Sequence, residues 1–239
     1  MYLSIVIPAY NEEKSIEGAL DGIFRFMGTK DYDYETILVD DGSGDSTAFR
    51  AEQSDLAKAG LLRLIKNETN RGKGYSVRKG ILSSRGEYVL FTDADMSTPI
   101  EEIDKLFGAL DKGHDIAIGS RGVKGSNVRP RQPWYRQSMG KMFNLLVKLL
   151  VIKGVNDTQC GFKLFKGAIA REIAPLLRIE GFCFDVEMLY LAGKKGCRIK
   201  ETGIVWGHSS GSKVRLVGSS SRMFSDLMKI KTMHNENTL

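Results

Sequence analysis

Short apolar runs that each stop at a cluster of polar residues recur through the first half of this chain. The clearest one covers residues 89–95, where Val-Leu-Phe-Thr leads into two carboxylates, Asp93 and Asp95, with one alanine between them. Comparable runs lie at 3–7, 36–39, 61–65 and 115–119, and stretches with helical character separate them. Apolar strands that alternate with helices predict an α/β fold, here a Rossmann-like, mostly parallel sheet flanked by helices.

The polar clusters follow the predicted strands at the point where each one ends. They comprise Tyr10 with Asn11, Asp40 with Asp41, residues 71–74, Asp93 with Asp95, and Arg121. In sheets of this kind, ligands bind beyond the carboxyl ends of the strands. Five clusters at one predicted edge therefore indicate a single functional site.

The carboxylates of Asp93 and Asp95 are the candidate metal ligands. Residues two apart in extended backbone point to the same side and lie roughly 6.5–7 Å apart, so both can face one divalent cation. Their hard oxygens suit Mg²⁺ or Mn²⁺, and such an ion can bridge a diphosphate. Residues 31–33 have the same Asp-x-Asp spacing, but no apolar run leads into them, and we interpret them as a polar loop.

Composition narrows the possible partners. The net charge of +6 favours anionic partners such as nucleotides, lipid phosphates or a membrane surface, but the basic residues are too dispersed to indicate nucleic acid. Neither a G-x-G-x-x-G dinucleotide fingerprint nor a P-loop occurs. Three cysteines without C-x-x-C spacing predict reduced thiols and a cytosolic setting. We expect no signal peptide and no spanning helix, which would need about 20 apolar residues.

The second half of the chain carries two amphipathic segments. Residues 139–152 are apolar at ten of fourteen positions, and they suit either a core helix or a membrane interface with lysines reaching the headgroups. Residues 221–233 predict a final amphipathic helix. Further features lie between these two segments. Residues 156–163 predict a polar loop running into Leu164 and Phe165, and residues 199–206 predict a strand. Asp185 and Glu187 lie at the start of an apolar helix, and Lys213 lies in a basic loop.

Four motifs in the first half, in order, resemble family 2 glycosyltransferases of the GT-A fold: residues 6–12, 38–43, 70–74 and 93–95. In the second half, residues 157–163, 184–187 and 211–214 resemble polyprenyl-phosphate sugar synthases. Among these the chain is most similar to dolichyl-phosphate β-glucosyltransferases, and next to dolichyl-phosphate mannose synthases. Unlike the eukaryotic glucosyltransferases it shows no N-terminal membrane anchor, so we expect peripheral contact with the cytoplasmic face of a membrane, through 139–152 and 221–233.

The resemblance implies one catalytic domain over residues 1–215, followed by the amphipathic helix and tail of 216–239. Its nucleotide-sugar half would be 1–121 and its acceptor half 122–215. The implied reaction is metal-dependent, inverting transfer of glucose from UDP-glucose to a dolichyl or polyprenyl phosphate.

The same resemblance implies roles for individual residues. On the donor side, the residues expected to line the base and ribose are Pro8, Ala9, Tyr10 and Glu12. One carboxylate of Asp40 and Asp41 would accept a hydrogen bond from the base, and Lys73 and Arg78 would bind the diphosphate or the ribose. The metal motif would consist of Asp93, Ala94 and Asp95. On the acceptor side, Arg121, Arg131 and Lys213 would bind the lipid phosphate, while Asp157, Gln159, Asp185 and Glu187 would orient those cations or contact sugar hydroxyls. A phosphate monoester has a second pKa near ~6 and needs little help from a base, whereas a hydroxyl acceptor would need Asp185 or Glu187.

Several alternatives remain open on the sequence. The donor could be GDP-mannose, and the oligomeric state is undetermined. A sugar-nucleotidyltransferase is disfavoured because its Gly-rich N-terminal loop is replaced by residues 7–11. A non-enzymatic membrane-binding module would explain the basic charge and amphipathic segments, but not the carboxylate pair. Each of these groups could also have a purely structural role. These roles are a helix cap for Asp40 and Asp41, a plain turn for 72–74, helix-start carboxylates for Asp185 and Glu187, and a solvated cation for Lys213.

Overall fold

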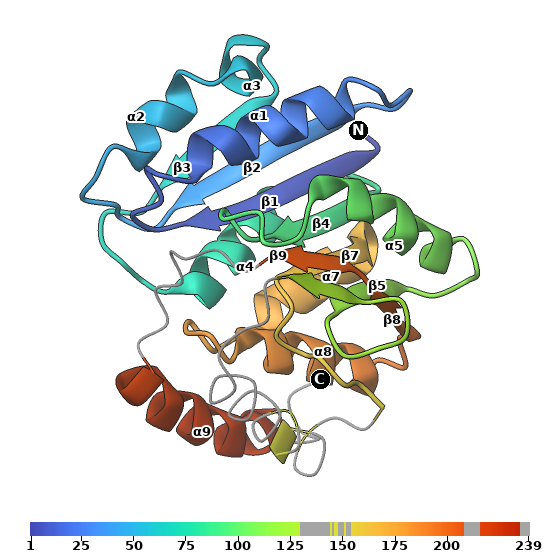
Figure 1. Cartoon of the computed structure of the whole chain (residues 1–239). Coiled ribbons are helices and arrows are strands. Elements are labelled where there is room, and N and C mark those ends of the chain that lie inside the picture. The colour runs from blue at the N-terminus through green and yellow to red at the C-terminus, as the bar shows by residue number, and fades with distance from the viewer. Residues whose placement is uncertain (130–143, 145, 148–150, 152–153, 208–215, 235–239) are drawn as a thin grey trace.

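A seven-stranded sheet forms the centre of the molecule (Figure 1). The computed structural model describes residues 1–129, 144, 146–147, 151, 154–207 and 216–234. Its strands lie in the order β3-β2-β1-β4-β7-β5-β8. They are β1 (Leu3–Ala9), β2 (Tyr34–Asp40), β3 (Leu62–Lys66), β4 (Tyr88–Thr92), β5 (Ile116–Ser120), β7 (Phe162–Lys166) and β8 (Ile199–Gly203). Two short strands, β6 (Asn127–Arg129) and β9 (Val205–Gly207), pair in parallel beside it.

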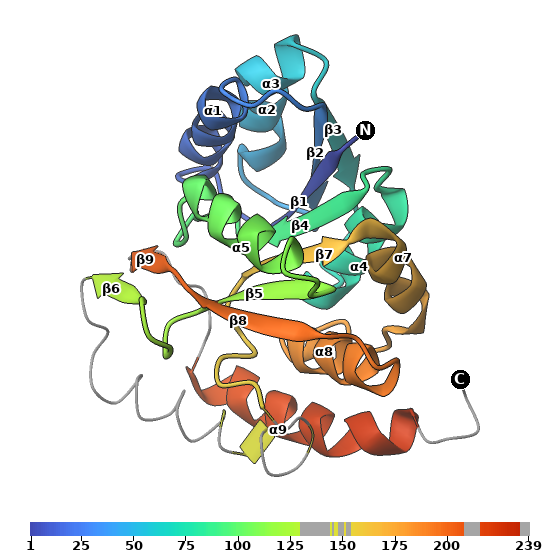
Figure 2. The ribbon, with the colours of Figure 1, turned by 90° about the vertical axis from the view of Figure 1, so that its right-hand side faces the viewer.

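Helices cover both faces of this sheet, as Figure 2 shows. One face carries α1 (Ile16–Met27), α2 (Thr47–Glu52), α3 (Asp55–Lys58) and α5 (Ile103–Leu110), the last preceded by the short 3-10 helix η1 (Ile100–Glu102). The other carries α4 (Lys73–Ser83), α7 (Gly167–Ile173) with η2 (Ala174–Leu176), and α8 (Phe184–Lys194). Helix α9 (Leu216–Met233) lies outside α8.

Burial of both faces explains the nearly continuous apolar strands. Along β1, Ile5 and Ile7 pack into the core beneath α1 and α5, whereas Val6 packs into the second core beneath α4 and α8. All seven residues of β1 are buried. The alternating strand and helix pattern thus yields the predicted α/β class, with a layer of helices on each side of the sheet.

Strand β7 is the main departure from the sequence-based expectation of a polar loop running into Leu164 and Phe165. It lies between β4 and β5 and is antiparallel to both, while the other pairs of the large sheet are parallel. The predicted strand over 199–206 divides into β8 and β9. Helix α9 begins at Leu216, before the expected start at 221.

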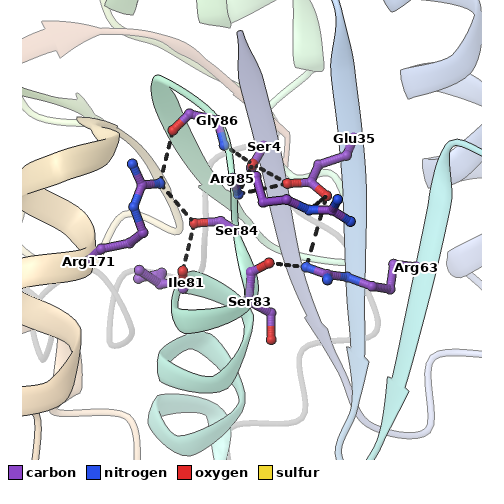
Figure 3. A network of polar contacts seen from close by, with 9 residues as sticks. All are labelled: Ser4, Glu35, Arg63, Ile81, Ser83, Ser84, Arg85, Gly86 and Arg171. Atoms are coloured by element: carbon purple, nitrogen blue, oxygen red, sulfur yellow. Dashed lines mark hydrogen bonds and ion pairs between the residues drawn. The ribbon is translucent and has the colours of Figure 1, made fainter. Parts of the chain in front are cut away.

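The amino ends of β1 and β2 are fastened by a buried polar network (Figure 3). The carboxylate of Glu35 accepts hydrogen bonds from the Ser4 hydroxyl at 2.7 Å and the Arg85 amide at 2.8 Å. Arg63 and Arg85 form ion pairs with it at 3.9 and 3.8 Å. Arg171 on α7 bonds to the same loop before β4. This edge is opposite to the predicted site.

The two amphipathic segments behave differently in the described residues. Val147 is fully buried in the second core, and Leu146 and Val151 pack against it, so this part of 139–152 is core. On α9, one side packs inward through Leu227 and Ile230, as Phe224 and Met228 stay exposed. None of the described helices combines the length and apolar character needed to span a bilayer. The division into halves at residue 121 stays a prediction.

Candidate active site

The loops that follow β1 and β2 are tied together at the carboxyl edge of the sheet. The Asn11 side chain accepts the amide of Gly44 at 2.8 Å, and the Glu12 amide donates to the Thr47 hydroxyl at 2.7 Å. Asn11 has a φ of +52°, in the left-handed region that asparagine tolerates better than most residues. These bonds hold the segment after Pro8 and Ala9, which are buried, beside the loop after β2, and they leave Tyr10 41% exposed at the edge.

Asp40 and Asp41 are both buried, and both carboxylates accept hydrogen bonds from backbone amides. Asp40 accepts the amide of Ser43 at 3.2 Å, together with the Ser43 hydroxyl. Asp41 accepts the amides of Arg71 at 3.0 Å and Gly72 at 2.8 Å. These bonds order the turn after β2, and Asp41 in particular sets the loop from which Lys73 starts α4. The alternative of a helix cap is not borne out, because the N-cap of the next helix, α2, is Ser46. A contact of either residue with a nucleotide base stays a prediction.

Lys73 forms an ion pair with one of the two strand-end carboxylates, that of Asp93. Its ammonium lies 2.7 Å from Asp93 Oδ1. Burial alone would lower the pKa of Lys73, but attraction to Asp93, Asp185 and Asp95 outweighs it and raises the pKa above its ordinary value. Burial and repulsion from Asp93 raise the pKa of Asp95, although the Ser97 amide donates to it at 3.0 Å. The positive charge of Lys73 therefore offsets only part of the negative charge of Asp93 and Asp95.

This pair fits a divalent cation. Within the described residues, Asp93 Oδ1 is buried and has no hydrogen-bond donor apart from the Lys73 ammonium of the ion pair. A hard cation would satisfy that oxygen and relieve the repulsion that raises the pKa of Asp95. No group of three or more His, Cys, Asp or Glu side chains surrounds a possible metal position in the described part of the chain. Oxygens of a bound diphosphate or water would have to complete the coordination.

Gly161 supports Asp93 from the beginning of β7. The Asp93 amide donates to the Gly161 carbonyl at 3.1 Å. A Cβ placed at 161 would lie 2.0 Å from Asp93 Oδ2, so any side chain at 161 would displace this carboxylate. Gly161 was not among the residues predicted for the site. A glycine directly before an apolar run was the available signal for such close backbone approach.

Arg121 forms a bidentate ion pair with Asp157. Nε and Nη2 donate at 2.7 and 2.8 Å, and the backbone amide adds a third bond to the same carboxylate at 3.0 Å. Burial alone would lower the pKa of Arg121, but the hydrogen bonds to Asp157 raise it, and the same bonds lower the pKa of Asp157 against its own burial. The Trp206 ring lies 5.5 Å from the guanidinium carbon. Arg121 is thus a permanently charged group in a fixed orientation.

Asp185 and Glu187 lie in different surroundings. The Asp185 carboxylate pairs with Lys163, a lysine in β7. Glu187 is fully buried and accepts the amides of Arg178 at 3.0 Å and Ile179 at 2.9 Å, with His234 Nε2 at 2.6 Å. Glu187 thus links α8 to the preceding loop and to the end of α9. Its oxygens serve those groups in this structure, and a contact of Glu187 with substrate stays a prediction.

The remaining predicted residues form two groups. Some lie in or beside the loops of the site, and others lie outside the described residues. Ala94 is buried, and Arg78 is half-buried on α4. Gln159 is half-buried on the loop that carries Asp157. Arg131 and Lys213 lie outside the described residues.

Comparison with known proteins agrees with this arrangement. The glycosyl transferase family 2 profile matches residues 4–173. A dolichyl-phosphate beta-glucosyltransferase of Dictyostelium discoideum is 39% identical over 97% of this chain and 74% of its own length. The human dolichyl-phosphate beta-glucosyltransferase is 36% identical over 96% of this chain and 74% of its own length.

Solved structures show the fold. The crystal structure of Mycobacterium tuberculosis glucosyl-3-phosphoglycerate synthase with UDP has a TM-score of 0.71 at 19% identity, over 98% of this chain and 82% of that one. Its complex with Mn²⁺, UDP-glucose and phosphoglyceric acid has the same TM-score of 0.71 at 18% identity, over 98% and 81%. The predicted GT-A architecture and family resemblance are confirmed, and the chain belongs to glycosyl transferase family 2.

Proposed function

We propose that this glycosyltransferase moves glucose from UDP-glucose to a dolichyl or other polyprenyl phosphate, with Mg²⁺ or Mn²⁺ as cofactor. The observation that carries the proposal is the Asp93 and Asp95 pair at a sheet edge where Lys73 pairs with Asp93 and Arg121 offers a second cation. The names of the curated relatives support the sugar and the lipid.

On the donor side, the chain supplies acids for the metal and a cation for the diphosphate. Asp93 and Asp95 would hold the metal, which when bound offsets the negative charge of the leaving nucleoside diphosphate. Asp41 fixes the loop that presents Lys73, and Lys73 stays protonated beside its acidic neighbours. Its ammonium is therefore available to the diphosphate. Pro8, Ala9, Tyr10, Glu12, Asp40 and Arg78 stay our predicted contacts for the rest of the nucleotide.

On the acceptor side, a cation is more important than a base. A phosphate monoester with a second pKa near ~6 is largely dianionic at neutral pH, so its oxygen attacks without losing a proton. Arg121 suits this role because Asp157 fixes its orientation while 31% of its side chain stays exposed. Gln159 lies on the same loop as Asp157. Arg131 and Lys213 remain proposed acceptor contacts, and a single in-line displacement with inversion follows from the family resemblance.

Peripheral contact with a membrane is the remaining part of the proposal. The exposed Phe224 and Met228 lie one turn apart on α9, within the predicted segment 221–233. Exposed apolar side chains on the outside of a helix suit insertion among lipid headgroups. The described residues of 139–152 are core, so α9 is the better candidate for this contact.

A donor panel tests the reaction. Purified protein would be incubated with detergent-solubilised dolichyl phosphate, Mn²⁺ or Mg²⁺, and UDP-glucose or GDP-mannose, with and without a chelator. We expect chelator-sensitive glucosyl lipid from UDP-glucose. Mannosyl lipid alone would end the glucose assignment. Nucleotide binding without any lipid product would move the acceptor to another molecule.

A further inference from the structure

Lys163 is a fully buried lysine in the middle of the sheet, with no exposed side-chain surface. Its ammonium pairs with Asp185 and donates to the Cys160 carbonyl at 2.5 Å. Taking two ions out of water costs more than their attraction usually returns, so a buried pair is weak ground for a role in stability alone. Such a pair next to a functional site suggests a role in that site.

One path from Lys163 reaches Asp93 through backbone. The lysine holds the carbonyl of Cys160, and the next residue is Gly161, whose carbonyl accepts the Asp93 amide at 3.1 Å. Gly161 also contacts the Asp93 carboxylate so closely that a Cβ would lie 2.0 Å from Oδ2. A shift of the 160–161 backbone would therefore displace the Asp93 side chain.

A second path passes through charge. Asp185 attracts both Lys163 and Lys73, and Lys73 in turn pairs with Asp93 at 2.7 Å. The ring of Phe91 lies 5.3 Å from Lys73 Nζ and 5.5 Å from Lys163 Nζ, so both ammonium groups also share one aromatic ring. Without Lys163, Lys73 would be the cation left to Asp185 among the described residues that act on it, and Asp185 would compete with Asp93 for it.

We propose that Lys163 is a positioning residue that fixes the Asp93 carboxylate for a divalent cation, through the Cys160–Gly161 backbone and through Asp185. Lys163 is too deeply buried to contact a substrate itself. The metal part of the inference rests on the proposed function, whereas the positioning of Asp93 does not. It also gives Asp185 a role that differs from a general base, since its carboxylate is occupied by Lys163.

Three variants test the proposal. Lys163→Met removes the charge at similar length, and Lys163→Met/Asp185→Asn also removes the carboxylate that would otherwise be left unpaired. Lys166→Met is the matched control on the same strand, because Lys166 pairs with Asp115 at the opposite edge of the sheet. Affinity for Mn²⁺ in the presence of UDP would be measured by the electron paramagnetic resonance of free Mn²⁺, and crystal structures of wild type and the double variant would be compared.

We expect both Lys163 variants to bind Mn²⁺ about 10-fold or more weakly than wild type, as outer-shell substitutions commonly do, and Lys166→Met to match wild type. The crystal structure of the double variant should show Gly161 and the Asp93 carboxylate displaced. Failure of both Lys163 variants to fold would assign the lysine to the fold alone and overturn the proposal.

Wild-type Mn²⁺ affinity in folded Lys163 variants would overturn it as well, and so would an unmoved Asp93 in the crystal structure. If wild type itself binds no Mn²⁺ with UDP, the proposed metal-dependent function fails instead. The position of Asp93 in the double variant then still decides whether Lys163 positions it.

Discussion

The two edges of the central sheet both gather charged residues, but the carboxylate pair of Asp93 and Asp95 at the carboxyl edge differs from the carboxylates at the amino edge. At the amino edge, Glu35 is surrounded by two hydrogen-bond donors and two arginines (Figure 3). Asp115 at the same edge accepts bonds from the Lys166 ammonium at 2.8 Å and the Arg198 amide at 2.9 Å. At the carboxyl edge, Lys73 forms an ion pair with Asp93, and its positive charge also acts on Asp95.

The pKa shifts record this difference. The hydrogen bond from Lys166 is the main cause that lowers the pKa of Asp115. Burial and the neighbouring Asp93 raise the pKa of Asp95. Charge at the amino edge is therefore neutralised within the protein, as is the charge of Asp157 beside Arg121, whereas the charge of the Asp93 and Asp95 pair is left for a ligand to neutralise. The balance of charge distinguishes a structural edge from a functional one better than the number of charged residues does.

The largest effect we predict is that of Asp95→Asn. Loss of a metal ligand should lower turnover by about 10³-fold or more, since a metal contributes several kcal/mol to the transition state. The melting temperature should stay the same or rise, because the substitution removes a carboxylate that Asp93 repels. A glucosyl-lipid assay and calorimetry measure the two quantities. A wild-type rate would contradict the metal assignment, and a clearly lower melting temperature would contradict the charge balance described here.

A smaller but still large loss is expected for Gly161→Ala. The added methyl group would lie 2.0 Å from Asp93 Oδ2 and must displace that carboxylate. A shift of this size at a reacting group commonly costs about 100-fold in rate. Gly122→Ala is the matched control, since a Cβ at 122 meets nothing within 4 Å although it follows Arg121. Equal activities of the two alanine variants, measured by the same lipid assay, would show that Asp93 tolerates the displacement.

Local sequence patterns were enough to predict much of the fold and of the site. The apolar runs that became β1, β2, β4 and β5 stop at their polar clusters, so the sheet edge with Asp93 and Asp95 was predictable from neighbouring residues. The contact between Asp157 and Arg121 was among the roles that the family resemblance implied.

Long-range geometry was harder to predict. Strand β7 reads as a loop because Lys163 interrupts its apolar run, and the acid that pairs with this lysine lies on α8. Asp185 and Glu187 were correctly predicted at the start of a helix, but they were given one shared role. On a helix, residues two apart point to nearly opposite sides, so one faces Lys163 and the other faces His234.

At the amino edge we predict an effect on stability without an effect on chemistry. Glu35→Gln should lower the free energy of unfolding by about 2 kcal/mol, since a buried charged acceptor with several donors is lost. Turnover below the melting transition should match wild type. Urea unfolding measures the loss. Glu52→Gln is the control: its ion pair with Lys66 is about half exposed, and we expect a change below about 0.5 kcal/mol. A loss of activity in folded Glu35→Gln would show that the amino edge also affects the chemistry, which would contradict the proposed difference between the two edges.

The smallest effect concerns Asp115→Asn and its dependence on pH. The pKa of Asp115 is lower in the folded chain than its ordinary value of 3.8, so its contribution to stability is fully present above that value and is lost as the pH falls through the folded pKa. Wild type should therefore exceed the variant by about 1 kcal/mol at pH 7, the usual size of such a hydrogen bond, and the gap should close on acidification below the ordinary value.

Urea unfolding of both proteins between pH 7 and pH 3 measures that gap. Asp95→Asn provides the opposite comparison. Because the pKa of Asp95 is raised, its ionisation costs stability at neutral pH, and that cost disappears as the pH falls through the raised pKa toward the ordinary value. The variant should thus be at least as stable as wild type at pH 7 and lose this advantage in acid. If both substitutions changed stability with the same sign at pH 7, the two edges would not differ in their charge balance.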